Sequence, residues 1–401
     1  MSAAQRRTLI LAAAFCGIFG LYDVLYAVFT LAGGPSIGPL LEVPFPDFLV
    51  FHATTRAFFE GKLALVYDID LFTRFQIATY PDRLPQTLLF RPFFYPPIFV
   101  LLLLPLGLLG VAKAYTVFMT VTAGAATLLE GRRDPWGWLA IVISPAALWV
   151  VLAGQNTFLS LALLYGGLRL LDRSPAAAGV LLGLLSYKPQ IWVVVPLALL
   201  AARQWRALLW TIGTVAMLSL VSLALFGLDF WLAFLEASRE AASPRVVNEM
   251  FENIFMHMTT LLPAMRILGF PPAVAATVQL AGAVLAVAAV WHAFRRHGPS
   301  DARTAVLVTA MFLISPYTLN YDLLLLMPVA VALFRQGQAQ GFYTGERLIY
   351  VALWGIPTMC MAVNLAGFPI TPLIVLLFGW IAWMRLKGSS KVELPSAATA
   401  G

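Results

Sequence analysis

Long apolar stretches alternate with short polar ones along almost the whole chain. Apolar runs of about eighteen residues or more can cross a ~30 Å hydrocarbon core as helices. Helices satisfy their own backbone hydrogen bonds, which lipid cannot do for an open strand edge. The pattern therefore predicts an all-α integral membrane protein with about twelve transmembrane helices, at residues 8–31, 94–110, 112–130, 136–153, 156–171, 176–200, 206–226, 272–294, 304–319, 321–335, 348–365 and 369–386.

Two stretches do not fit this pattern of spans. Residues 32–92 are predicted to form a first outer loop, which is too long to serve only as a connection between two spans. Residues 227–270 form a second outer loop, in which the apolar piece 258–268 is too short to cross and is predicted to be a re-entrant or interfacial helix. No further domain is expected, so residues 1–401 are predicted to form a single polytopic membrane domain.

The first outer loop contains the pattern of an amphipathic helix. Prolines precede Asp47, which can start a helix that ends near Gly61, and a C-terminal glycine is a common helix stop. Within it, four phenylalanines contrast with a polar stripe formed by His52, Arg56 and Glu60. A helix of this kind is expected to lie flat at the membrane surface.

A second surface helix is predicted at about 71–79, with Asp68 or Asp70 before it. Two interpretations of Asp47 remain open at this stage. The structural one is an N-cap that accepts backbone N–H bonds, and the functional one is a catalytic carboxylate. The two are compatible, because a carboxylate that caps a helix at an interface still faces whatever binds there.

Composition supports the membrane assignment and sets an orientation. The chain is 61% hydrophobic and 11% charged, against about 25% charged for soluble domains. Its net charge of +7 comes from short basic groups at the ends of apolar runs, the positive-inside pattern and not a nucleic-acid footprint. With an even number of spans, the cytoplasmic groups are Arg6/Arg7, Arg203/Arg206, Arg295/Arg296/Arg303, Arg335/Arg347 and Arg385/Lys387, whereas Arg132/Arg133 and Arg169/Arg173 disagree.

Lys188 lies near the middle of the predicted span 176–200. A lysine inside the bilayer costs at least about 2.5–3.5 kcal/mol, so it usually faces a cavity or pairs with an anion. Pro189 frees backbone groups and can kink the helix there. Binding of a ligand is favoured, and a lysine paired only for packing is the alternative.

The remaining polar positions gather at the ends of spans. Arg91 either clamps a phosphate or anchors the chain at the interface beside Tyr95. The amides in the segment 154–156 are interpreted as satisfying broken helix ends. The candidates predicted on the outer face are His257, Arg266, Asn320, Tyr321 and Asp322. No phosphate-binding glycine loop or metal-ligand cluster is recognised in the sequence, so no cofactor or metal is expected.

Several blocks, in order, resemble the family-87 glycosyltransferases, integral membrane enzymes of the GT-C class. They are PDF and the helix ending in EG, LVYD, FYPP, GQN followed by FL, AGVLLGLLSYKPQ, LLPAMRILG and SPYTLNYDLLLL. The resemblance runs from about Asp47 to Pro328 and lies in the order of the blocks. One departure is His257-Met258-Thr259, which stands where the mannoside-building members tend to carry Asn-Gln-Ser, and this leaves the acceptor open.

The resemblance implies a GT-C-like helix bundle and an inverting transfer from a polyprenyl-phosphate sugar, with mannose favoured, to a lipid or glycan acceptor. It implies a multi-pass protein of a bacterial-type inner (plasma) membrane whose active site faces the periplasm or exterior, with no obligatory metal. Asp47 occupies the place of the family's catalytic base. The accompanying hypotheses are donor-phosphate binding by Lys188, Arg91 and Arg266, and substrate binding by His52, Arg56, Tyr95, His257, Asn320, Tyr321 and Asp322.

A transporter or lipid flippase is the alternative from a different class. Many spans and an intramembrane lysine are normal there too, but broken helices in matched halves would be more typical.

Overall fold

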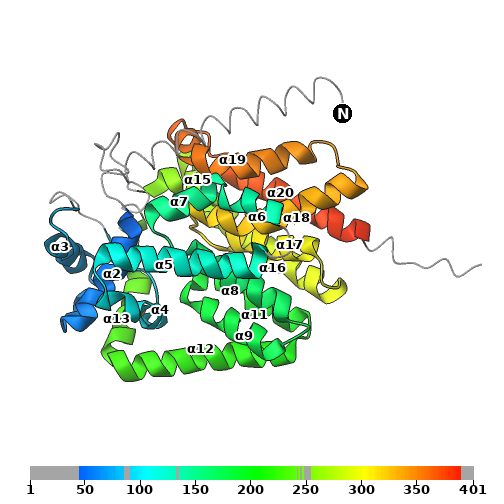
Figure 1. Ribbon diagram of the computed structural model, residues 1–401. Coiled ribbons are helices and arrows are strands. Elements are labelled where there is room, and N and C mark those ends of the chain that lie inside the picture. The colour runs from blue at the N-terminus through cyan, green and yellow to red at the C-terminus, as the bar shows by residue number, and fades with distance from the viewer. Residues whose placement is uncertain are drawn as a thin grey trace, which may run out of the picture. The chain divides into compact units, whose positions relative to one another are not determined.

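The computed structural model describes residues 45–84, 91–131, 135–241, 243, 246–247 and 254–389 (Figure 1). The chain divides into two compact units, each described by itself. The Asp47 unit comprises the described residues of Phe19–Pro189 and Arg206–Phe255, and the Arg295 unit comprises those of Gln190–Trp205 and Met256–Gly401. The predicted span 8–31 lies outside the described residues.

The Asp47 unit is built from helices throughout its described part. They are α2 (Pro46–Phe59), η1 (Leu63–Leu65), α3 (Ile69–Thr79), α4 (Pro97–Leu103), η2 (Leu104–Leu108), α5 (Val111–Ala126), η3 (Thr127–Gly131), α6 (Pro135–Val142), α7 (Pro145–Ala153), α8 (Thr157–Leu170), α9 (Pro175–Leu184), η4 (Leu185–Tyr187), α12 (Trp205–Phe226) and α13 (Leu228–Glu240), with α10 (Pro189–Trp192) at its edge.

The Arg295 unit is also helical. Its elements are α11 (Val194–Ala201), η5 (Phe255–His257), α15 (Leu261–Ile267), α16 (Pro272–Arg296), α17 (Asp301–Ile314), η6 (Asn320–Leu326), α18 (Met327–Gln340), α19 (Glu346–Leu365) and α20 (Thr371–Ser389). One isolated β-bridge joins Met258 to Leu319. The all-α membrane class predicted from the sequence is therefore confirmed.

The predicted number of spans is not supported. In the described residues, 5 helices are long and apolar enough to cross a membrane: Val111–Leu129, Trp205–Phe226, Pro272–Arg296, Glu346–Leu365 and Thr371–Gly388. The pair α6 and α7, bent by 52°, raises this number to 6 if it forms one span. The predicted spans 94–110, 156–171 and 176–200 contain shorter apolar helices: Pro97–Leu108, Thr157–Leu170, Pro175–Tyr187 and Pro189–Ala201.

Proline explains most of the difference between apolar runs and continuous helices. Pro97, Pro145, Pro175 and Pro189 each start a helix. A proline lacks the N–H that would continue a preceding helix, but it fits the first turn of a new one. An apolar run identified by hydropathy therefore contains two or three short helices where a proline interrupts it.

Both helices predicted in the first outer loop are present. The Asp68 side chain caps α3 by accepting the Leu71 N–H at 2.9 Å. Gly61, with φ of 68°, follows the end of α2, and the Lys62 N–H reaches the Ala57 carbonyl at 2.7 Å. This is the Schellman arrangement expected for a C-terminal glycine.

The expected two-faced character of α2 is wrong for its central part. Phe48, Phe51 and His52 are all buried, although His52 was predicted on a polar stripe. The helix packs against α4, α5, α7 and η2, which cover it on several sides. Its phenylalanines thus fill a protein core, and periodicity alone does not distinguish that from burial in a lipid surface.

A helix missed in the second outer loop, α13, packs on the first loop. It begins after Gly227, whose φ of 82° turns the chain out of α12. The Phe230 ring lies 4.7 Å from the Tyr67 ring, between centroids. The shorter piece predicted within 258–268 is present as α15, and its re-entry into a membrane stays a prediction.

Gly154 sets the distance between α7 and α2. It ends α7 with φ of 73°, and a Cβ atom there would lie 2.5 Å from the Phe48 Cβ. Such a distance is not tolerated without movement of one helix. Gly61 has a similar φ of 68° but no atom within 4 Å of its would-be Cβ, which makes it a matched control.

We expect G154A to destabilise the protein more than G61A. Both variants incur the left-handed backbone cost of about 1–2 kcal/mol, and G154A adds overpacking of about 1–3 kcal/mol. Thermal unfolding of the two purified variants in the same detergent measures the difference. Equal melting temperatures would show that α2 and α7 are not in tight contact.

The Arg295 unit contains a buried ion pair between α19 and α20. The Arg385 guanidinium contacts both Glu346 carboxylate oxygens, at 2.5 and 2.7 Å, and the two side chains are 4% and 0% exposed. The same carboxylate accepts the Tyr350 hydroxyl at 2.6 Å and the Tyr343 N–H at 2.8 Å. Arg385 is therefore neutralised inside the unit, although the sequence placed it among the free cytoplasmic charges.

We expect E346Q to lower stability by about 3 kcal/mol, because removing one partner leaves the other charge buried. E60Q removes the partner of the exposed Arg56 and serves as the control, with an expected loss of less than about 1 kcal/mol. Thermal or denaturant unfolding compares the two. A loss for E346Q no larger than for E60Q would contradict the assignment of Glu346–Arg385 as a structural pair.

Candidate active site

Asp47 lies at the start of α2, in the Asp47 unit. The N-cap of this helix is Phe45, in the left-handed region with φ of 43°, and it makes no capping side-chain hydrogen bond. Asp47 is therefore inside the first turn and not the N-cap. Its Oδ2 accepts a hydrogen bond from the Gln155 side-chain amide at 2.7 Å, across 108 residues of sequence.

Gln155 is held in this orientation by two further contacts. Its Oε1 accepts the Asn156 N–H at 3.2 Å and faces the Tyr95 hydroxyl at 3.4 Å. Because the oxygen is turned to donors, the amide N–H groups are free to face the Asp47 carboxylate. Gln155 is buried and follows Gly154 directly, so the close approach of Gly154 to α2 brings the amide to the carboxylate.

Asn156 continues the polar chain toward Lys188. The Asn156 Oδ1 lies 3.4 Å from the Lys188 ammonium nitrogen, and both residues are buried, at 0% and 2% exposed. Among the described residues, the Asn156 Nδ2 atom has no hydrogen-bond acceptor although it is buried. An amide donor without an acceptor in an apolar interior is costly, and a ligand oxygen would satisfy it.

Lys188 occupies a break in the helical run. It follows η4 with φ of −119° and ψ of 73°, and Pro189 then starts α10. Beside it, the Tyr187 hydroxyl lies 2.7 Å from the Ser160 hydroxyl and donates to the Asn156 carbonyl at 3.2 Å. The kink predicted at Pro189 is thus a helix break that presents the lysine to the amides.

Arg91 reinforces the start of α2. Its guanidinium donates to the Pro46 carbonyl and, at 3.1 Å, to the Gln76 side chain on α3. Burial lowers the pKa of the Arg91 guanidinium, and the nearby Asp47 carboxylate acts in the opposite direction. The arginine therefore ties α3 to the residue before Asp47, and phosphate binding by Arg91 stays a prediction.

His52 and Arg56 line a separate cavity of about 500 Å³ together with Tyr80, Asp82 and Arg83. The His52 Nε2 lies 2.9 Å from the Leu109 carbonyl, and its Nδ1 lies 2.6 Å from the Tyr80 hydroxyl. Burial lowers the pKa of His52. The ring is thus neutral, with Nε2–H donating to the carbonyl and Nδ1 accepting from the hydroxyl.

The other predicted residues belong to the Arg295 unit. Asn320 donates to the Pro357 carbonyl at 3.1 Å, and the Asp322 Oδ2 accepts the Leu319 N–H at 3.1 Å, so both organise the start of η6. Burial lowers the pKa of His257 to about 4, which keeps it neutral at pH 7. The two remaining candidates are Tyr321, at the start of η6, and Arg266, near the end of α15.

The structure thus brings together Asp47, Arg91, Tyr95 and Lys188. It adds Gln155 and Asn156, which sequence pattern alone indicated only as helix-end amides. The signal for these two was available: adjacent amides directly after a glycine, between two apolar runs. The amide pair (Gln155 and Asn156) does lie at a helix break, and it also joins a carboxylate to an ammonium group.

Comparison with known proteins identifies the family. The model of glycosyltransferase family 87 matches residues 93–316, more than half of the 401 residues. This range contains the amide pair and Lys188, whereas Asp47 precedes it. Neither the curated proteins nor the solved structures gave a match to the chain. The chain belongs to glycosyltransferase family 87.

Proposed function

We propose that the protein transfers a sugar, with mannose the first to be tested, from a polyprenyl-phosphate donor to the hydroxyl group of a lipid or glycan acceptor. The transfer inverts the anomeric carbon, and Asp47 is the general base. The observation that carries this proposal is the series of hydrogen bonds from Asp47 to the Gln155 side chain, from the Asn156 backbone N–H to Gln155, and from Lys188 to the Asn156 side chain.

An inverting transfer needs one carboxylate to accept the proton of the attacking hydroxyl. Asp47 suits this role because it is partly exposed and one of its oxygens is oriented by Gln155. A base held in one orientation reacts without reorganisation when the acceptor binds.

The leaving group is a phosphate, which departs without the second carboxylic acid that glycosidases use. It requires fixed positive charge and hydrogen-bond donors at the developing negative charge. Lys188 supplies the charge in this proposal, and the Asn156 Nδ2–H group without an acceptor supplies a donor. Arg91 acts by positioning the start of α2, and Arg266 remains a candidate second phosphate ligand.

The proposal includes a GT-C-like helix bundle, in which shorter apolar helices cross the membrane in addition to the long ones. Four apolar helices or helix pairs of intermediate length support this: Pro97–Leu108, Thr157–Leu170, Pro175–Tyr187 and Pro189–Ala201. The active site then faces the outer side of an inner membrane, opposite the basic groups of the positive-inside pattern. Membership of a glycosyltransferase family favours this function over the transporter alternative.

We expect D47N to reduce sugar transfer by about 100-fold or more, because the amide cannot accept the proton of the acceptor hydroxyl. Purified enzyme is incubated with labelled polyprenyl-phosphate sugars and a total lipid extract, and labelled product is quantified. The D68N variant is the matched control, since Asp68 caps α3 and asparagine caps a helix about as well as aspartate. Full activity of folded D47N would remove Asp47 from the mechanism.

We expect K188M to lower transfer by about 100-fold while the melting temperature stays equal or rises. A buried ammonium group is costly to desolvate, so methionine relieves the fold of that cost, whereas the donor phosphate loses its cation. K62M, at an exposed lysine, is the control. A variant with unchanged activity, or one that unfolds, would instead support a lysine kept for packing.

A further inference from the structure

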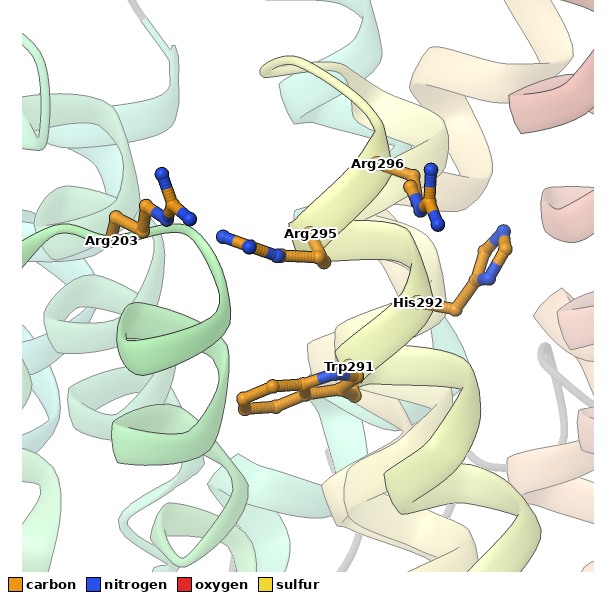
Figure 2. Close-up of a pocket in the computed structure, with 5 residues that line it drawn as sticks. All are labelled: Arg203, Trp291, His292, Arg295 and Arg296. Atoms are coloured by element: carbon orange, nitrogen blue, oxygen red, sulfur yellow. The ribbon is translucent and has the colours of Figure 1, made fainter.

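A second cavity, of about 670 Å³, lies within the Arg295 unit where α11 and α16 end. Its lining is almost wholly basic: Arg203, His292, Arg295 and Arg296, with Trp291 as the aromatic member (Figure 2). None of these residues belongs to the site around Asp47. We call this cavity the basic pocket.

The two elements face one another across the basic pocket. Trp291 and Arg295, four residues apart, extend from α16 toward the turn that carries Arg203 (Figure 2). His292 and Arg296, also four apart, lie on the other flank of α16. One guanidinium group from the turn after α11 and one from α16 therefore converge, with an indole ring below the Arg295 group in this view.

Within the described part of the chain, no carboxylate forms a salt bridge with Arg203, Arg295 or Arg296. Convergent like charges repel, and an anion between them removes the repulsion. The planar guanidinium group matches the geometry of phosphate oxygens, which it can bind through two hydrogen bonds at once. The basic pocket is thus complementary to a phosphate group.

Arg203 is held in an unusual backbone conformation. It follows α11 with φ of 57°, and the Gln204 N–H reaches the Leu199 carbonyl at 2.9 Å, which completes a Schellman ending. Glycine is the usual residue at this position, because the Cβ atom of any other residue strains the left-handed backbone. Strain of this kind at a site points to a role for the side chain.

The face of α16 that carries Trp291 and Arg295 continues toward the N-terminus of the helix as an exposed apolar stripe. Leu280, Val284 and Val287 are 66%, 59% and 39% exposed and lie at helical spacing below Trp291, which is 43% exposed. An acyl chain fits such a stripe, and tryptophan typically lies at the level of the lipid headgroup. The occupant is therefore expected to carry both a phosphate and an acyl tail.

Basic residues near helix C-termini are common without a ligand, because they compensate the helix dipole. That effect explains Arg295 and Arg296 in the last turn of α16. It does not explain an arginine in a glycine conformation opposite them, or the apolar stripe aligned with the same face. These two observations favour a bound lipid.

We propose that the basic pocket binds the phosphate headgroup of an anionic membrane lipid, whose acyl chain lies along Leu280, Val284 and Val287 of α16. The pocket lies at the membrane face that the charge pattern predicts to be cytoplasmic. Arg203 and Arg295 bind the phosphate oxygens, and Trp291 packs against the glycerol region. The site is independent of sugar transfer at Asp47.

The test uses full-length, delipidated protein and native mass spectrometry with added phosphatidylglycerol or phosphatidylcholine. Wild type is expected to retain phosphatidylglycerol in preference, and R203G and R295Q each to lose about tenfold in apparent affinity, the loss of one charged hydrogen-bonded contact. R206Q removes the same charge near the same helix end but outside the pocket, and it is expected to bind like wild type.

R203G keeps the test interpretable, because glycine fits the positive φ and the variant is expected to melt no lower than wild type. Unchanged lipid retention in R203G and R295Q, or equal retention of the two lipids by wild type, would overturn the proposal. Displacement of phosphatidylglycerol by inorganic phosphate, but not by sodium chloride of the same ionic strength, would indicate that the pocket binds a soluble anion. That result would overturn the proposal that its ligand is a lipid.

Discussion

Polar groups in an apolar interior need a partner within the protein or from a ligand, and this constraint shapes how the chain is built at each helix break. Prolines interrupt the apolar runs and free backbone carbonyls, and side-chain amides bind several of them. Gln279 donates to the carbonyls of Leu313 and Ser315, at 2.7 and 3.1 Å, where α17 ends before Pro316. Helix breaks and buried amides therefore occur together.

Two buried polar clusters meet this constraint to different degrees. The Glu346 carboxylate has a two-point contact with Arg385 and further bonds from Tyr350 and Tyr343. Such saturation is typical of a structural pair, because no capacity is left for a ligand. The cluster around Asn156 differs, since its Nδ2 atom lacks an acceptor in the described residues. A donor left over beside a lysine is what a phosphate-binding site requires before its substrate arrives.

Local signals in the sequence predicted part of the local structure. The glycine after α2, an aspartate before α3 and the short helix α15 follow from capping rules and run length, whereas the N-cap of α2 and the helix α13 were not predicted. The predicted number of about twelve spans was not supported, because hydropathy does not show where prolines divide an apolar run into shorter helices. The prediction that His52 lies on an exposed polar stripe was wrong for a related reason. Periodicity shows that a helix has two faces, but it does not show what covers each face.

The candidate site could be predicted only in part, because its central contact is tertiary. Asp47 and Lys188 each stand out as ionisable residues among apolar ones, whereas the role of Gln155 depends on Gly154 lying against Phe48. No spacing in the sequence encodes that approach. Pairing of residues 47 and 155 could be inferred only from a structure, as could the hydrogen bonds by which Arg91 ties α3 to the start of α2.

The amide pair also explains how a base and a cation can be kept in fixed relation. Gln155 contacts the proposed base and Asn156 contacts Lys188, so one peptide unit separates the two contacts. A single planar peptide has few ways to deform, and a site positioned on it stays within a narrow range of geometry. Electrostatic stabilisation of a transition state depends on such preorganisation, since dipoles that must reorient lose most of their effect. In the proposed reaction, Gln155 is therefore a positioning residue for the base, whereas Asn156 contacts Lys188 and also donates to the phosphate.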